Sequence, residues 1–230
     1  MIRVCFSLLT FALLTSLIVD LPSFSGDRET AKVQLATAAL REITKIPEKT
    51  IPPSLLKNAY GIAVIPEIFK VGFVLGGQRG IGILTIKQVN GNWSYPTFIS
   101  LTSGSIGYQG GAQLSDAILV FKTPKSIKSI RDGKFTLGAD ASIAAGPVGR
   151  KATAATDLKL DAEIYSYSRS KGLFAGVSLE GASLKIDSKS NERYYKNKYV
   201  STNQILSSKA VRLPNSGKQF LNEIYKRVDH

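Results

Sequence analysis

Glycines punctuate the apolar runs between residues 51 and 111, and they constrain the fold more than any other feature. They stand at Gly72, Gly76, Gly77, Gly80, Gly82, Gly91, Gly104, Gly107, Gly110 and Gly111. Glycine has no Cβ, so a dense series marks places where a backbone bends tightly or two backbones approach closely. The series therefore predicts bent, closely packed strands, and its spacing is not that of a phosphate-binding loop.

The start of this segment predicts a short helix followed by a strand. Pro52 and Pro53 suit the entry and first turn of a helix, where a missing N–H costs little. Gly61 is expected to end that helix in a left-handed cap. The apolar run 62–65 has the length of a strand, and Pro66 is expected to close it.

Later segments alternate apolar and polar residues at strand spacing. Strands are expected over 81–87, 93–98, 97–101, 117–121, 161–169 and 182–187, and a tightly packed strand pair over 135–145. Asn90-Gly91 is a strong hairpin signal. A connecting helix is expected to start at Thr123-Pro124 and to end at Asp132-Gly133.

The two ends of the chain show helical periodicity. In the first, apolar residues share one face: Leu35, Ala39, Ile43 and Ile46; in the last, they are Phe220, Leu221, Ile224 and Tyr225. The first helix is amphipathic, and its apolar face either packs on the core or lies in a membrane interface. We favour packing, because this face lacks large aromatic residues.

These elements predict an α+β fold dominated by strands. We expect a mainly antiparallel sheet curled into a barrel or sandwich, with N- and C-terminal helices and short connecting helices. A transmembrane barrel is disfavoured, because 117–121 is apolar on both faces and helices interrupt the strands. The expected organisation is a signal peptide over 1–25, the amphipathic helix over 26–50, a domain core over 51–195 and a C-terminal extension with a helix over 196–230.

Residues 1–25 have the pattern of a secretory signal: Arg3, an apolar run over 4–19, then small residues at the cleavage positions. The alternative is an uncleaved anchor, although the run is shorter than the ~20 residues that span a bilayer. The only cysteine, Cys5, lies in this segment. The mature chain is therefore expected to have no disulfide, no cysteine nucleophile and no cysteine zinc ligand.

Catalytic candidates are few. The single histidine is His230, the last residue, and the carboxylates are scattered. A glycosidase-like pair of carboxylates from distant positions stays an alternative, but we expect no enzyme, no cofactor and no metal.

The charge is strongly basic: 30 Lys and Arg against 17 Asp and Glu give +13. Such a chain favours anionic partners. Several cations surround the predicted helix near 124–131: Lys122, Lys125, Lys128, Arg131 and Lys134. Nucleic acid is disfavoured by the export signal, which leaves acidic lipid or an acidic envelope component.

Six stretches, over 56–66, 91–96, 107–111, 137–142, 146–150 and 167–181, resemble the SYLF domain family in the same order. The motif positions are Gly61, Pro66, Gly77, Trp93, Gln109, Gly138, Gly146, Pro147, Gly149, Arg150, Tyr167, Gly172, Gly176 and Gly181. The resemblance covers roughly 51–195 and implies a lipid-binding module, associated in eukaryotic members with phosphoinositide membranes and in fungal members also with actin filaments. It also implies membrane contact at the N-terminal edge of the domain, here matched by position at Lys32, Arg41, Lys45 and Lys49.

Our sequence-based hypothesis is a non-enzymatic module exported to a bacterial periplasm or envelope. It would bind anionic lipid or another acidic envelope component through Lys32, Arg41, Lys45, Lys49, Lys122, Lys125, Lys128 and Arg131. The alternative is a structural or interaction module that binds an envelope or cytoskeletal protein. The identity of the lipid and the oligomeric state stay open.

Overall fold

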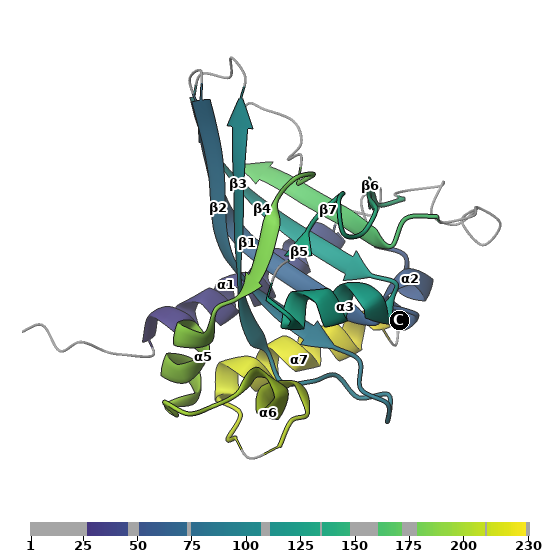
Figure 1. The fold of residues 1–230 in the computed structure, drawn as a ribbon. Helices are drawn as coiled ribbons and strands as arrows, with labels where there is room; N and C mark the ends of the chain where they lie inside the picture. Colours follow the sequence, from purple (N-terminus) through teal and green to yellow (C-terminus); the bar gives the residue numbers. More distant parts are fainter. Residues whose placement is uncertain are drawn as a thin grey trace, which may run out of the picture.

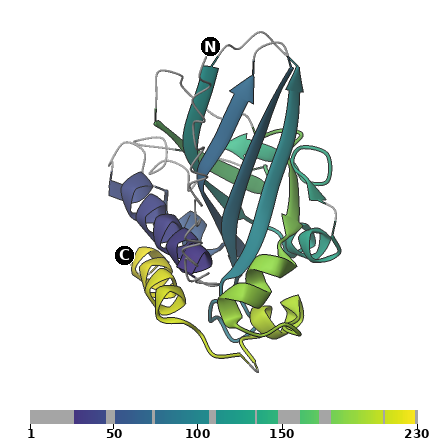
Figure 2. The same cartoon turned by 90° about the vertical axis from the view of Figure 1, so that its left-hand side faces the viewer.

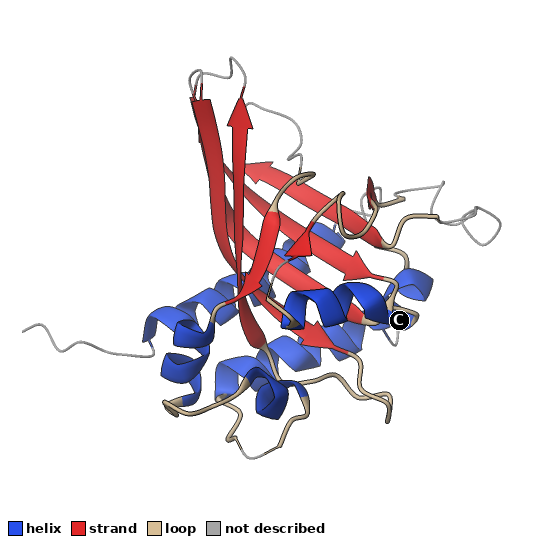
Figure 3. Cartoon of the chain, viewed as in Figure 1, coloured by secondary structure: helices blue, strands red, loops and turns tan. Residues whose placement is uncertain are grey.

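The computed structural model describes residues 27–45, 51–72, 75–106, 111–133, 135–147, 161–171, 179–209 and 211–228. The predicted α+β class is confirmed, with helices packed around one curled, mainly antiparallel sheet (Figure 1, Figure 3). The expected signal peptide lies outside the described residues. In the part that is described, no helix is both long and apolar enough to cross a bilayer.

Eight strands form the sheet in the order β5-β8-β3-β2-β1-β4-β7-β6. Their bounds are β1 Gly61–Gly72, β2 Leu75–Ile86, β3 Thr97–Ile106, β4 Gly111–Phe121, β5 Phe135–Thr136, β6 Ile143–Ala145, β7 Ile164–Lys171 and β8 Ser183–Ile186. Neighbouring strands are antiparallel except β6 and β7, which are parallel.

The sheet curls because its two edge strands are close neighbours in the chain. β5 and β6 are at opposite ends of the strand order, yet only residues 137–142 separate them. Eight flat strands would hold the edges about 34 Å apart, whereas so short a link reaches at most about 20–25 Å. The prediction that 135–145 forms a strand pair is therefore wrong, since β5 pairs with β8 and β6 pairs with β7.

Two expectations about β1 are corrected. The helix α2 (Pro53–Lys57) forms as predicted, but its C-cap is Asn58, and Gly61 is the first residue of β1. Pro66 does not end the strand, because a register shift between Ile65 and Ile68 accommodates it. At this bulge Glu67 has a φ of 53°, and its N–H donates to Asp116 Oδ1 at 3.0 Å.

The predicted turn between β2 and β3 is confirmed. Gly91 has a φ of 82°, its N–H donates to Gln88 O at 2.9 Å, and a bridge pairs Lys87 with Trp93. The regular strand begins only at Thr97, after Pro96, so only 97–98 of the strand expected over 93–98 belong to β3. Trp93 is buried beneath the turn region, 3% exposed.

The remaining helices are α1 (Asp27–Lys45), α3 (Pro124–Arg131), α5 (Ser188–Tyr195), α6 (Thr202–Leu206) and α7 (Asn215–Val228). Alternating β1 residues point to two apolar clusters: Ile62 and Val64 to one, Ala63 and Ile65 to the other. α1, α5 and α7 contribute to the first cluster, α3 to the second. The buried face of α1 consists of Val33, Ala36, Ala39, Leu40 and Ile43. The prediction that α1 packs on the core is confirmed, with Leu35 only half-buried.

Among the described residues, ion pairs join α1 to four other parts of the chain. Two reach the C-terminal helices: Glu29 to Arg193 of α5 at 2.6 Å and Arg41 to Glu223 of α7 at 2.9 Å. Two reach the sheet: Lys32 to Glu67 at 3.3 Å and Glu42 to Arg169 at 3.1 Å. Figure 2 shows α1 and α7 side by side on one face of the sheet.

Candidate functional site

A groove opens between the start of β1 and α3. Phe121 ends β4, Thr123 is the N-cap of α3, and Pro124 occupies its first turn, as the sequence predicts. Gly61 allows α3 to pack closely, because an added Cβ there would lie 2.5 Å from Ile127 Cδ1. Because Gly61 has no side chain, Ile127 can pack directly on β1, and α3 lies close to the strand.

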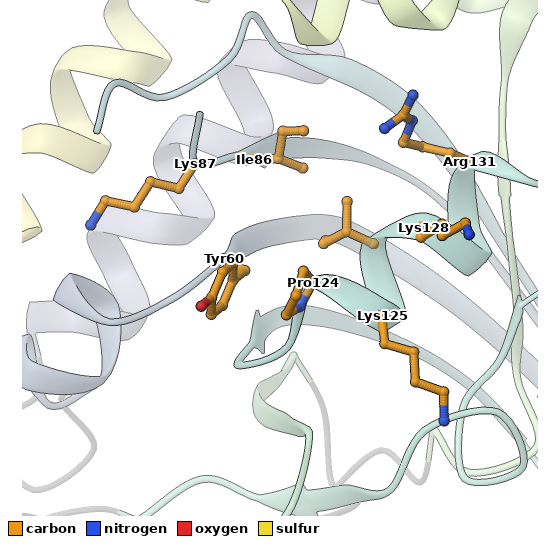
Figure 4. Close-up of a pocket in the computed structure, with 8 residues that line it drawn as sticks. Tyr60, Ile86, Lys87, Pro124, Lys125, Lys128 and Arg131 are labelled. Carbon is orange, nitrogen blue, oxygen red and sulfur yellow. The ribbon is translucent and has the colours of Figure 1, made fainter. Parts of the chain in front are cut away.

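The groove consists of two adjoining hollows, which we call together the basic groove. The first, about 560 Å³, is lined by Tyr60, Ile86, Lys87, Pro124, Lys125, Ile127, Lys128 and Arg131 (Figure 4). The second, about 480 Å³, is lined by Lys57, Asn58, Ala59, Tyr60, Lys87, Gln88, Val89 and Pro124. Tyr60, Lys87 and Pro124 line both hollows, so the two hollows meet at these residues.

Five cations surround the groove: Lys57, Lys87, Lys125, Lys128 and Arg131. Among the described residues, no carboxylate lines the groove and none of the five cations is in an ion pair. Like charges around one concave surface create a positive potential that attracts anions.

Local contacts hold two of these cations in place. Lys87 Nζ donates to the carbonyl oxygen of Lys57 at 2.6 Å and lies 5.8 Å from the centroid of the Trp93 ring. The guanidinium of Arg131 donates to the side-chain oxygen of Asn203 in α6. The groove is therefore partly preorganised for an anionic ligand.

The floor of the groove is apolar. Ile127 is 6% exposed, Ile86 is half-buried, and Tyr60 is 47% exposed beside Pro124. In Figure 4 the side chains of Tyr60 and Pro124 lie together, while Lys125, Lys128 and Arg131 extend along α3. The arrangement offers cations at the rim and an apolar surface between them.

The structure brings together only some of the predicted cations. Lys125, Lys128 and Arg131 line the groove, whereas Lys122 lies outside its lining, with Nζ 5.8 Å from the centroid of the Tyr165 ring. Lys32 and Arg41 pair with carboxylates of the protein itself and do not line the groove. The side chain of Lys45 and all of Lys49 lie outside the described residues.

The sequence analysis missed Tyr60, Lys57 and Lys87. Pairing of Gly61 with Ile86 at the start of β1 brings Tyr60 next to Lys87, and the Lys87 N–H donates to Tyr60 O at 2.9 Å. The apolar run before Pro66 and the Asn90-Gly91 turn indicate both strands, but not their register. Without the register of β1 against β2, the sequence could not predict that Lys57 and Lys87 lie on one surface.

Several motif positions have structural roles. Gly146, Pro147 and Tyr167 meet at one sheet edge, where the Tyr167 hydroxyl donates to Pro147 O at 3.3 Å. Gly138 and Gly181 have φ of 87° and 77°, and the Gly181 N–H donates to Leu137 O. Gly61, Pro66, Gly77 and Trp93 belong to β1, β2 and the turn described above. Gln109, Gly149, Arg150, Gly172 and Gly176 lie outside the described residues.

The described residues hold no catalytic constellation that we can identify. They contain no group of three His, Cys, Asp or Glu side chains able to hold a metal ion. Burial raises the pKa of Tyr194 to about 12 and raises the pKa values of Tyr167 and Tyr195 as well, so these phenols stay protonated at neutral pH. They are core residues without access to a ligand.

Comparison with known proteins gives a family match. Residues 102–227 match the Ysc84 family, described as Las17-binding protein actin regulator. LAS seventeen-binding protein 3 of Saccharomyces cerevisiae is 38% identical over 151 residues, 64% of this chain and 33% of the relative. SH3 domain-containing YSC84-like protein 1 of Xenopus laevis is 31% identical over 211 residues, 89% of this chain and 59% of the relative. The chain thus spans about a third to three fifths of the length of these relatives.

Proposed function

The chain belongs to the Ysc84 family, which contains the SYLF domain, and from this we propose that it is a non-enzymatic module that binds an acidic protein partner in the basic groove. The observation that carries the proposal is that five cations surround an apolar floor, and no carboxylate lines the groove among the described residues. A protein surface that combines acidic and apolar side chains would complement both features.

The names of the relatives support a protein partner. The family is described as Las17-binding protein actin regulator, and the yeast relative is named LAS seventeen-binding protein 3. Actin filaments are therefore the first partner to test, as an acidic protein polymer. Export directed by residues 1–25 stays a prediction. If the protein is exported, the partner to test is an acidic protein of the cell envelope.

Reversing the charge of three groove cations tests the proposal. Lys125→Glu, Lys128→Glu and Arg131→Glu together are expected to weaken co-sedimentation with actin filaments at least tenfold, because repulsion replaces attraction across the groove. All three side chains are exposed, so the melting temperature is expected to change little.

The matched control carries Lys189→Glu, Lys196→Glu and Lys218→Glu. These lysines are also exposed, lie outside the groove lining and give the same change in net charge. The control is expected to bind as the unmodified protein does. Equal binding by the groove variant and the unmodified protein would refute the proposal, and equal losses in both variants would reduce it to a net-charge effect.

An anionic lipid surface is the second candidate. It is favoured by the position of Lys125, Lys128 and Arg131 on one short exposed helix, because each cation near an anionic membrane contributes on the order of 1 kcal/mol. The same two variants, sedimented with neutral and anionic vesicles at low and physiological salt, separate the candidates. Loss of vesicle binding in the groove variant, with actin binding unchanged, would select lipid over protein.

A further inference from the structure

We propose that the ligand of the basic groove is a short acidic peptide segment that carries one or two large apolar side chains at one end. This inference rests on the proposed function and adds the chemical pattern of the ligand. Apolar residues line both hollows, but the cations are unevenly distributed: Lys125, Lys128 and Arg131 line only the first hollow, and the second adds only Lys57. Each end of the groove therefore matches one part of such a segment.

The half of the groove along α3 is suited to carboxylates. Lys125, Lys128 and Arg131 are spaced three residues apart, so over about 9 Å of the helix they fan across roughly 120° of its exposed surface and form a loose row (Figure 4). An extended peptide advances about 3.3 Å per residue, and side chains on one side of it repeat at about 7 Å. Two carboxylates on alternate residues would therefore reach this row, and the guanidinium of Arg131 can bind a carboxylate with two hydrogen bonds.

The other half of the groove is suited to an apolar side chain. Its large exposed apolar residues are Tyr60, 47% exposed, and Val89, fully exposed in the turn after β2. Ile86 and Ile127 line the first hollow together with Tyr60. An aromatic or large aliphatic side chain placed against Tyr60 would remove this surface from water.

A peptide fits the two halves better than a lipid does. A lipid headgroup would engage the cations and leave Tyr60 and Val89 uncovered. An acyl chain is best buried in an enclosed cavity, whereas Tyr60, Pro124 and Val89 are all exposed to solvent. An acidic segment with an apolar side chain at one end uses both hollows along the length of the groove.

Fluorescence anisotropy with labelled peptides tests the inference. The probes are hexapeptides of four glutamates and a Phe-Leu pair, with the pair at either end, and the same peptides with Ala-Ala in place of Phe-Leu. The unmodified full chain is expected to bind one of the Phe-Leu peptides about tenfold more tightly than its alanine counterpart. Tyr60→Ala is expected to reduce this preference to about twofold or less, with little change in binding of the alanine peptide.

Phe69→Ala is the matched control. Phe69 is 48% exposed, like Tyr60, but it lies in the distal half of β1 beyond the bulge and outside the groove. It is expected to keep the full preference. If both variants lost the preference for the Phe-Leu peptide, the preference would reflect nonspecific hydrophobic binding and not a contact with Tyr60. That result would overturn the inference.

The remaining outcomes separate the inference from the proposed function. If all peptides bind equally and the charge-reversed groove variant binds none of them, the apolar part is wrong and the basic groove stands. If the charge-reversed variant binds every peptide as the unmodified chain does, the proposed function fails too. If anionic vesicles bind in the groove and no peptide competes with them, lipid is the ligand and the inference is overturned.

Discussion

Gly146→Ala is expected to lower the free energy of unfolding by about 3 kcal/mol, at the upper end of the usual cost of overpacking. An added Cβ would lie closer than 2.5 Å to the Tyr167 ring, against its Cζ atom. Tyr167 is 4% exposed and belongs to the apolar cluster beneath α1 and α7, so the ring has little room to move. Its hydroxyl also donates to Pro147 O, and a displaced ring would lose this contact.

Urea denaturation followed by tryptophan fluorescence measures the effect, and in a thermal scan the same loss corresponds to roughly 6–12 °C. Gly104→Ala is the control, because an added Cβ there meets nothing within 4 Å; Gly104 lies in β3, and Gly146 directly follows β6. The control is expected to change stability by less than about 1 kcal/mol. Similar losses in both variants would show that backbone freedom, and not the Tyr167 ring, determines the cost.

Glu223→Gln is expected to destabilise the protein by about 2 kcal/mol at pH 7. The Glu223 carboxylate is 4% exposed and accepts from Arg41 Nε at 2.9 Å and from Arg227 Nε and Nη2 at 3.1 and 2.8 Å. Glutamine keeps the shape but loses the charge, and its NH2 group would face an arginine donor. Arg41 is half exposed, which screens the pair and limits the loss.

The effect of Glu223→Gln is expected to depend on pH. Burial raises the pKa of Glu223, but hydrogen bonds from Arg41 and Arg227 and their charges lower it further, so the net pKa lies below its ordinary value. Because the pKa of Glu223 is lower in the folded state, its carboxylate stabilises the protein fully at a pH above its unfolded pKa of about 4.3. This contribution is lost as the pH falls through the folded-state pKa. The gap between the unmodified protein and the variant is therefore constant near neutrality and closes in acid.

Urea titrations from pH 7 to pH 3 check this expectation. Glu192→Gln is the control, because Glu192 also lies on a C-terminal helix but forms no ion pair in the described residues. Its stability difference is expected to stay small at every pH. A gap for Glu223→Gln that widened in acid would contradict the assigned pKa direction.

Local signals predicted the short elements well. Thr123-Pro124 and Asp132-Gly133 bracket α3 because capping and turn preferences act over a few residues. Gly61 shows the limit of such signals. Its local pattern fits a helix cap, but the structure requires glycine there for another reason: Ile127, far along the chain, packs where a side chain would lie. A close approach between distant residues leaves no mark in the neighbouring sequence.

The curl of the sheet and half of the groove depend on contacts of this kind. Residues 135–145 have strand character, but only pairing with β7 and β8 decides that their two strands join opposite edges. Lys57 and Lys87 are 30 residues apart and meet through the register of β1 and β2. The cations of α3 were predictable because they are close in sequence, and the cations across the groove were not.

The ion pairs of α1 also bear on how the chain folds as it is synthesised. Arg41 and Glu223 are 182 residues apart in the chain, and Glu29 and Arg193 are 164 apart. At ~5–20 residues per second, α1 leaves the ribosome roughly 10–40 s before α7 does. Throughout that interval the apolar face of α1 lacks its final partner, so the nascent chain stays incompletely folded and open to chaperones until its last helix has been made.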